Sequence, residues 1–548
     1  MSLLVDIFGY LSIIIHGLTI VAQSMMLGGV FFLVFLAGPL AARLGPAGLA
    51  IERDTLRIAA WSALGLILCE GATVALQSAV LVDTVNLGFG NVLEANFAIS
   101  GLVKIAAAAL TAIVLFRRDT PKAALLALGA IELAAATMTT HAAARLDSQA
   151  PLLVVAGLHQ LGAAIWIGGI PVFVSALARV HDGAAWRLVG ARFSRMSMLG
   201  VACILVSGLT MSVFFVGSLD AFYGTAYGVM VGAKVAMFGS LLLLGLGNYL
   251  VVERLRRDPA TSVRRMKRFA EVEIGIGFSV FFAAASLTSV PPAIDLTQDR
   301  VTWAEIVERN TPQWPRLTSP DHDVLALPAL QAKLDAEAAT TTSQAQEAFV
   351  PGSGELPARN AADIAWSEYN HHWAGLFVVA IGVLALLNRA GQRWARHWPL
   401  VFLGLAVFLL LRSDPEVWPL GTEGLLESLR DPEVVQHRFF ALLTIVFGVF
   451  EWRVRTGRMR GPRAALVFPL VTAIGGAALL THSHAIANVK DALLIELTHT
   501  PLALTAIWAG WARWLELRLD PPGNRIAGWV WPVAFVLIGF MLLGYREA

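Results

Sequence analysis

Nine of the twelve histidines in this 548-residue chain lie within or at the ends of long apolar stretches. Imidazole is the commonest borderline metal ligand and suits copper, zinc and haem iron. A single intramembrane histidine is often only a packing residue, but ionisable groups in apolar spans are costly and usually functional. We therefore expect metal or haem ligation from this set. The candidate ligands are His16, His141, His159, His371, His372, His437, His482, His484 and His499.

In the C-terminal part, several of these histidines follow a glutamate by three or four residues. This spacing places carboxylate and imidazole on one helical face. A glutamate can bind a metal itself or orient a ligand histidine, and Glu-x-x-His pairs also occur in di-metal helix bundles. Solvated glutamates at the water boundary are the alternative. The pairs are Glu368 with His371 and His372, Glu433 with His437, and Glu496 with His499.

Two lysines, Lys104 and Lys234, fall near the middle of apolar stretches, and Glu70 lies in a neighbouring stretch. A buried lysine requires a partner or a wet cavity. One interpretation is a structural Lys–Glu pair in each bundle, and the other is a cation path or proton-coupling site. Sulfur ligands are sparse, because the chain has no Met-x-x-Met or Cys-x-x-Cys motif and only Cys69 and Cys203 as cysteines.

The elements that position these residues are membrane spans. The chain is 57% hydrophobic and 15% charged, which excludes an ordinary soluble enzyme. Its net charge of +2 gives no reason to expect nucleic acid as a partner. Residues 1–7 carry an acid and no base, which argues against a signal peptide. Apolar stretches of about 20 residues predict an all-α protein with fourteen spans. They are 7–40, 57–82, 95–116, 122–141, 151–178, 196–217, 223–252, 269–291, 366–388, 398–411, 433–452, 464–482, 490–512 and 526–544.

Charge alternates between the loops that connect these spans. Loops after odd-numbered spans hold most of the Lys and Arg, whereas loops after even-numbered spans are nearly free of them. The positive-inside rule then places the odd-numbered loops in the cytoplasm and both termini outside. This topology puts the candidate histidines in the outer leaflet or at its edge.

The first four spans resemble the next four. Residues 67–73 match residues 204–210, His16 precedes the pair Gly28-Gly29 as His159 precedes Gly168-Gly169, and Lys104 corresponds to Lys234. We expect the glycine pairs to permit close helix packing. Such parallel repeats indicate two similar bundles. The predicted organisation is a four-helix bundle over 1–145, a second over 146–295, an outer loop or cap over 296–365, and a six-helix bundle over 366–548.

Several short segments of the second repeat resemble the CopD family of bacterial copper-resistance membrane proteins. The resemblance is clearest over residues 151–295 and weaker in the first repeat. It implies a multi-pass protein of the bacterial inner membrane that handles copper at its periplasmic side. The resembling residues are 158–161, 164–169, 193–195, Tyr227-Gly228 before Lys234, Asn248, and 287–293.

Three functions remain open on the sequence. The first, favoured by the resemblance, is copper binding through the outer histidines with transport or delivery, as a transporter or metal-binding protein rather than an enzyme. A periplasmic copper-binding protein or an electron-transfer partner would then meet it at the bilayer. The second is a b-type cytochrome in which the same histidines ligate haem. The third is a non-haem, iron-type metal oxidoreductase built on the Glu/His pairs. Lys104, Lys234 and Glu70 are the candidate transport path.

Overall fold

The computed structural model is all-helical in the part of the chain it describes, without an extended strand. Eleven helices in this part are long and apolar enough to cross a membrane. The chain is therefore an all-α multi-pass membrane protein, as predicted. The described residues are 2–85, 88–117, 121–145, 147–297, 300–320, 361–414, 417–421, 424–429, 432–481 and 489–547.

Three further predicted spans coincide with helices outside that set of eleven. They are α6 (Lys122–Thr137), α19 (Pro432–Arg455) and α20 (Val467–Leu479). α6 and α20 have 16 and 13 residues, fewer than the roughly 20 that cross a bilayer without tilt or extension. The number of fourteen spans and the outward position of both termini stay predictions.

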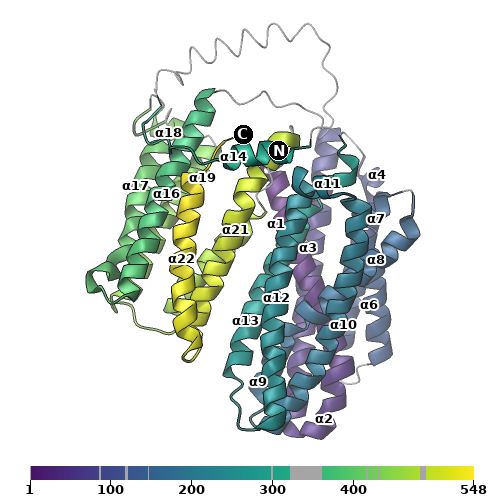
Figure 1. Cartoon of the computed structure of the whole chain (residues 1–548). Coiled ribbons are helices and arrows are strands. Elements are labelled where there is room, and N and C mark those ends of the chain that lie inside the picture. Colours follow the sequence, from purple (N-terminus) through teal and green to yellow (C-terminus); the bar gives the residue numbers. More distant parts are fainter. Residues whose placement is uncertain are drawn as a thin grey trace. The chain divides into compact units, whose positions relative to one another are not determined.

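The chain divides into two compact units, one formed by residues 1–300 with 480–483 and the other by 301–479 with 484–548. The predicted division into four segments stays an interpretation of the sequence. Figure 1 shows the long helices of each unit running side by side, with short helices at their ends.

The first unit contains both predicted repeats. The first repeat comprises α1 (Ser2–Phe32), the π-helical η1 (Leu33–Ala37), α2 (Gly38–Leu44), α3 (Pro46–Val85), α4 (Phe89–Leu93), α5 (Asn96–Leu115), α6 and α7 (His141–Ala144). The second comprises α8 (Gln149–Ala163), the π-helical η2 (Ala164–Gly168), α9 (Ile170–Arg179), α10 (Gly183–Phe215), α11 (Leu219–Gly224), α12 (Ala226–Arg257), α13 (Arg264–Leu287) and η3 (Ala293–Asp295). Because α1 packs against α3 and also against η2 and α13, the two repeats share one body.

Glycines make that shared body possible. A Cβ added to Gly168 would lie 1.9 Å from the backbone oxygen of Ser24, and one added to Gly28 would lie 2.4 Å from the backbone oxygen of Ala164. Helix α1 and the π-helical segment η2 therefore meet backbone to backbone. This is the close approach that small residues permit between membrane helices.

The second unit is built around α16 (Ala361–Arg389), α21 (Val489–Arg518) and α22 (Gly523–Leu543), with α22 packed against both of the others. Its core is aromatic, with Trp398, Phe468, Trp531 and Phe535 in mutual contact. The remaining elements are α14 (Trp303–Asn310), η5 (Arg393–Leu400), α17 (Val401–Arg412), α18 (Leu425–Ser428), α19, η6 (Ala464–Leu466) and α20.

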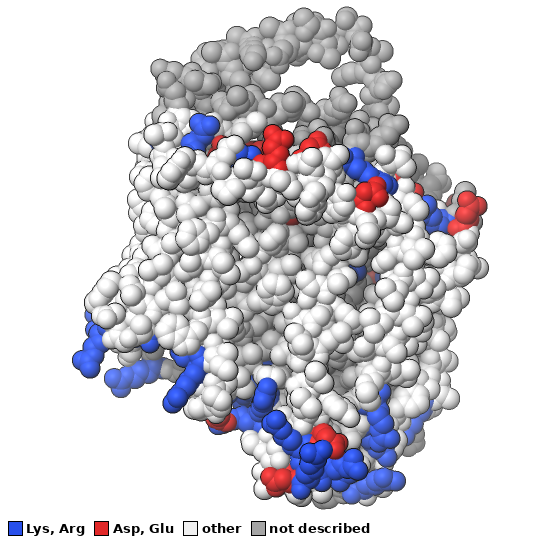
Figure 2. Space-filling model, in the orientation of Figure 1, with Lys and Arg blue, Asp and Glu red and all other residues white. Residues whose placement is uncertain are grey.

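Charge on the surface follows the loops. In Figure 2 the sides of the helices are almost free of charged side chains, whereas Lys and Arg gather at the lower helix ends of each unit. In the first unit these ends carry the basic turn around Arg264 and Arg265, between α12 and α13. An uncharged belt with basic ends is typical of a protein embedded in a bilayer.

Candidate metal and ion sites

A buried ion pair joins α3 and α5 in the first repeat. The Lys104 ammonium lies 2.6 Å from a carboxylate oxygen of Glu70, and each side chain is only 4% exposed. Gly101, one turn before Lys104, leaves room for this pair, because a Cβ there would lie 3.1 Å from the other Glu70 oxygen. The sequence placed Lys104 and Glu70 in neighbouring spans, and the structure brings their charges into contact.

A second carboxylate belongs to the same cluster. Glu132 on α6 is fully buried, and neither of its oxygens has a hydrogen-bond partner among the described residues. Its charge interacts with those of Lys104 and Glu70, and Lys104 also acts on the imidazole of His16. The first repeat thus gathers two carboxylates and one ammonium from three helices, and the ammonium also acts on His16 of a fourth.

The second repeat arranges its histidine differently. The Nδ1 atom of His159 lies 3.0 Å from the Ser207 hydroxyl oxygen, and that hydroxyl donates to the backbone oxygen of Cys203 at 2.6 Å. Ser207 therefore accepts the Nδ1 proton, which leaves the lone pair of the imidazole on Nε2. The charge of Lys234 acts on His159, and no carboxylate in the described chain pairs with Lys234. Hydrogen bonding at one ring nitrogen is how metal-ligating histidines are oriented.

Two polar contacts in this unit were not expected from the sequence. Gln23 of α1 donates to Gln160 of α8 at 3.2 Å, next to His159, and so bridges the two repeats. Glu273 is buried and accepts from Asn248 at 2.5 Å. The adjacency of Gln160 to His159 was the only signal for the first contact, and it gave no partner.

In the second unit the structure brings His371 of α16 and His499 of α21 together, with ring centroids 6.2 Å apart. Their Nδ1 atoms donate to the backbone oxygens of Ser367 and Ile495, at 2.8 and 2.9 Å. Both imidazoles therefore carry their lone pairs on Nε2. The ring of Tyr545 stacks on that of His371, with the ring centroids 3.8 Å apart. Candidate ligands on two separate helices of this unit thus lie next to each other, each with a fixed tautomer.

Glu547, near the C-terminus, is linked to this histidine pair through its hydrogen-bond partners. It accepts from the Tyr545 hydroxyl at 2.8 Å and from the Ser367 hydroxyl, and its charge acts on both histidines. Sequence reasoning missed Tyr545 and Glu547, because they follow the last helix without any spacing that links them to a histidine.

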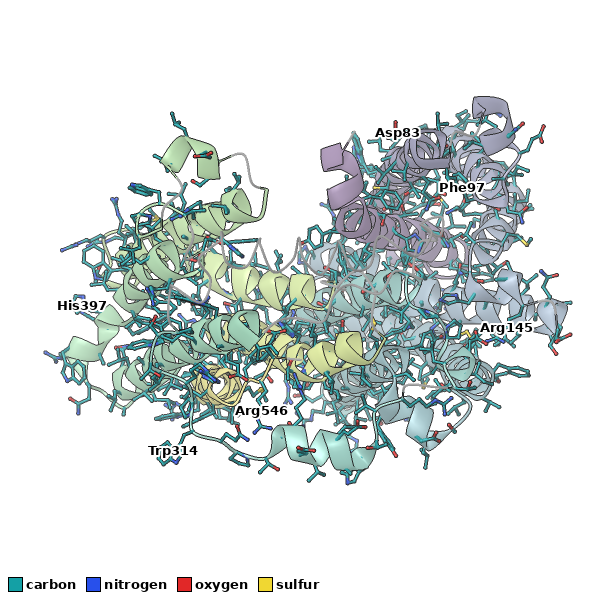
Figure 3. The ribbon with its side chains drawn as sticks, turned by 90° about the horizontal axis from the view of Figure 1, so that it is seen from above. Asp83, Phe97, Arg145, Trp314, His397 and Arg546 are labelled. Carbon is teal, nitrogen blue, oxygen red and sulfur yellow. The ribbon has the colours of Figure 1, made fainter. Side chains whose placement is uncertain are left out.

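The neighbouring His372 has a different environment. Its Nδ1 accepts from the backbone N–H of Arg316 at 2.7 Å, and its Nε2 donates to the backbone oxygen of Tyr545 at 2.9 Å. Both ring nitrogens are thus engaged by backbone groups. His372 lines a pocket of about 300 Å³ at this end of the unit, and Trp314 and Arg546, both labelled in Figure 3, also line it. Glu368, another lining residue, pairs with Arg316 at 3.3 Å.

The other candidate ligands lie apart from these pairs. His141 packs against Phe215 and Tyr227, His437 contacts Asp414 at 2.6 Å, and Glu496 accepts from Thr500 at 3.1 Å. His482, His484 and the side chain of Glu433 lie outside the described residues. Within the described part of the chain, no group of three or more His, Cys, Asp or Glu side chains is arranged to hold a metal ion.

Comparison with known proteins supports the resemblance seen in the sequence. Residues 187–287 match the family described as copper resistance protein D, CopD, which confirms that prediction for this segment. The copper transport protein CutJ of Bacillus subtilis (strain 168) is 34% identical over 133 residues. That match covers 24% of this chain and 23% of CutJ, so the chain spans about a quarter of its relative. No solved structure matches the chain.

The segment that matches CopD lies in the second repeat, from α10 through α13. It contains no histidine, but it supplies Ser207, which contacts His159, and Lys234, whose charge acts on His159. A candidate ligand outside the matched segment is thus oriented by a residue within it, Ser207.

Proposed function

We propose that this chain handles copper, binding it through histidines at the periplasmic side of the bacterial inner membrane and transporting or delivering it. The CopD match and the name of the CutJ relative support copper as the cargo. One contact links this proposal to a particular histidine. Ser207, inside the matched segment, lies against His159. It orients His159 as a ligand histidine is oriented.

The two units would contribute in different ways. The pair His371 and His499 offers two imidazole nitrogens, a donor set that suits copper. At His159, the ammonium of Lys234 opposes a resident cation. We therefore assign the histidine pair to copper binding and His159 to a position that copper passes. The pocket beside His372 would be the place where a periplasmic copper-binding protein meets the chain.

Copper content tests the binding assignment. Detergent-purified protein, loaded with copper and desalted, should retain copper, and X-ray absorption should report nitrogen ligands. His371→Ala and His499→Ala should each remove most of it. His397→Ala is the matched control, because His397 accepts from Trp452 and lies in a predicted cytoplasmic loop. If the wild-type chain retains no copper, or if the control loses as much as His371→Ala, the assignment is wrong.

One observation also favours a b-type cytochrome. Imidazoles from α16 and α21 with lone pairs on Nε2 are the donor set that bis-histidine haem ligation requires. An absorption spectrum of the isolated protein separates the two functions, since haem gives a Soret band that shifts on reduction. The di-metal centre gains no such support, because Glu368 pairs with Arg316 and Glu496 with Thr500.

A further inference from the structure

The buried cluster of the first repeat has one more negative than positive group. Lys104 is paired with Glu70 at 2.6 Å, and Glu132 adds a second carboxyl with no exposed surface and no hydrogen-bond donor among the described residues. An uncompensated charge inside a membrane protein is costly unless it gains a proton or a counter-ion. One further positive charge, such as a proton, would therefore make the cluster neutral.

The second repeat shows that the fold itself does not require this charge. Residues 134–139 match residues 283–288 at the ends of α6 and α13, so Glu132 corresponds to Phe281. Glu70 corresponds to Ser207. Phe281 is as well buried as Glu132. An apolar residue thus fills the same position, and the carboxyl at Glu132 is a feature of one repeat alone.

The groups around Glu132 can be named from the helices packed against α6, which are α1, α5 and α8. Their titratable side chains, among those described, are Tyr10 and His16 on α1, Lys104 on α5 and His159 on α8. The charge of Lys104 acts on Glu132. So does the charge of Glu70, which lies on α3, a helix packed against α5. A proton on Glu132 would leave Glu70 and Lys104 as a neutral pair.

From this geometry we infer that Glu132, with the Glu70–Lys104 pair, forms a proton-binding site in the first repeat. Glu132 takes up one proton as a neutral carboxylic acid and releases it as a carboxylate that then shares Lys104 with Glu70. If the proposed copper function holds, this site couples copper movement to the proton gradient. That last step rests on the proposed function, whereas proton binding itself does not.

Infrared difference spectroscopy of the detergent-purified full-length chain tests proton binding without copper. Between acidic and alkaline pH, the wild type should show the carbonyl bands of buried carboxylic acids, and Glu132→Gln should lose one band that Glu273→Gln keeps. Glu273→Gln is the matched control, because Glu273 is an equally buried glutamate of the second repeat. The proposal is overturned if Glu132→Gln keeps every band of the wild type, or if the only band lost is the one that Glu273→Gln loses.

A second measurement needs no variant. A carbodiimide that reacts with protonated carboxyls in apolar surroundings should label Glu132 in the wild-type chain, and mass spectrometry should show labelling that falls to background as pH rises. Absence of label on Glu132 at acidic pH contradicts the site. In proteoliposomes, Glu132→Gln should lose the dependence of copper uptake on the pH gradient. If the wild-type chain moves no copper, the transport step of the proposed function fails, while the infrared result still decides the proton site.

Discussion

The two repeats of the first unit have the same helices and the same central lysine, yet they surround that lysine differently. Lys104 is paired with Glu70 and accompanied by Glu132, whereas Lys234 has no carboxylate partner in the described chain. Ser207 occupies the position of Glu70 and holds His159 instead. One repeat thus has an excess of acid, and the other places an oriented imidazole beside a cation.

This difference is consistent with two separate tasks, proton binding in one repeat and metal binding in the other. A buried carboxyl can bind a proton, and an imidazole with a fixed tautomer can bind a metal cation. Because the CopD match lies in the second repeat alone, the acid cluster of the first repeat is outside the matched segment. Under the two proposals above, the acid cluster would serve coupling and His159 would serve the cargo.

The largest expected effect comes from the same substitution at both lysines. Lys104→Met leaves two buried carboxylates without their cation, and removing one partner of a buried pair costs roughly 3–5 kcal/mol. Lys234→Met removes a buried charge that has no carboxylate partner among the described residues, so stability should stay unchanged or rise. Denaturant or SDS unfolding of the purified proteins at neutral pH measures the difference.

Equal losses in the two variants would contradict the comparison, since they would mean that Lys234 also has a partner. Glu70→Gln in the Lys104→Met background provides the control. It removes one of the two stranded carboxylates and should recover part of the lost stability.

A smaller loss is expected where the repeats meet. Gly168→Ala places a methyl group 1.9 Å from the backbone oxygen of Ser24, and overpacking of this kind typically costs about 1–3 kcal/mol. Gly71→Ala, in α3, is the matched control, because a Cβ there meets nothing within 4 Å. The melting temperature in detergent should fall for the first variant only. If Gly168→Ala melts like the wild type, α1 and η2 are not in backbone contact.

Much of this fold was predictable because the length of apolar stretches reflects the thickness of the bilayer and the charge of the loops reflects their side of it. The helical membrane architecture and the resemblance to CopD both came from local patterns. The helix limits were less predictable. For example, the predicted span 122–141 ends as a helix at Thr137, and His141 begins a separate short helix.

The site was predictable only as a list of residue types. Spacing along one helix relates Glu368 to His371, but it does not show that Glu368 pairs with Arg316 across the unit. Nor does it show that His371 faces His499 with Tyr545 against it. Such pairings depend on which faces of two helices meet, and a sequence without a partner helix does not determine that. Tyr545 and Glu547 were missed for this reason.

The smallest effect on stability concerns the hydroxyl that distinguishes the second repeat. Ser207→Ala removes the acceptor for the Nδ1 proton of His159, a loss of about 1 kcal/mol. Ser240→Ala is the matched control, because among the described residues Ser240 bonds only the carbonyl of Ala236 in its own helix. Loss of an orienting partner typically weakens metal binding by about 10- to 100-fold. Copper uptake into proteoliposomes should therefore fall for Ser207→Ala and not for Ser240→Ala, while copper retained by His371 and His499 stays unchanged. Unchanged uptake would show that copper does not pass His159, and the division of tasks between the two repeats would then be wrong.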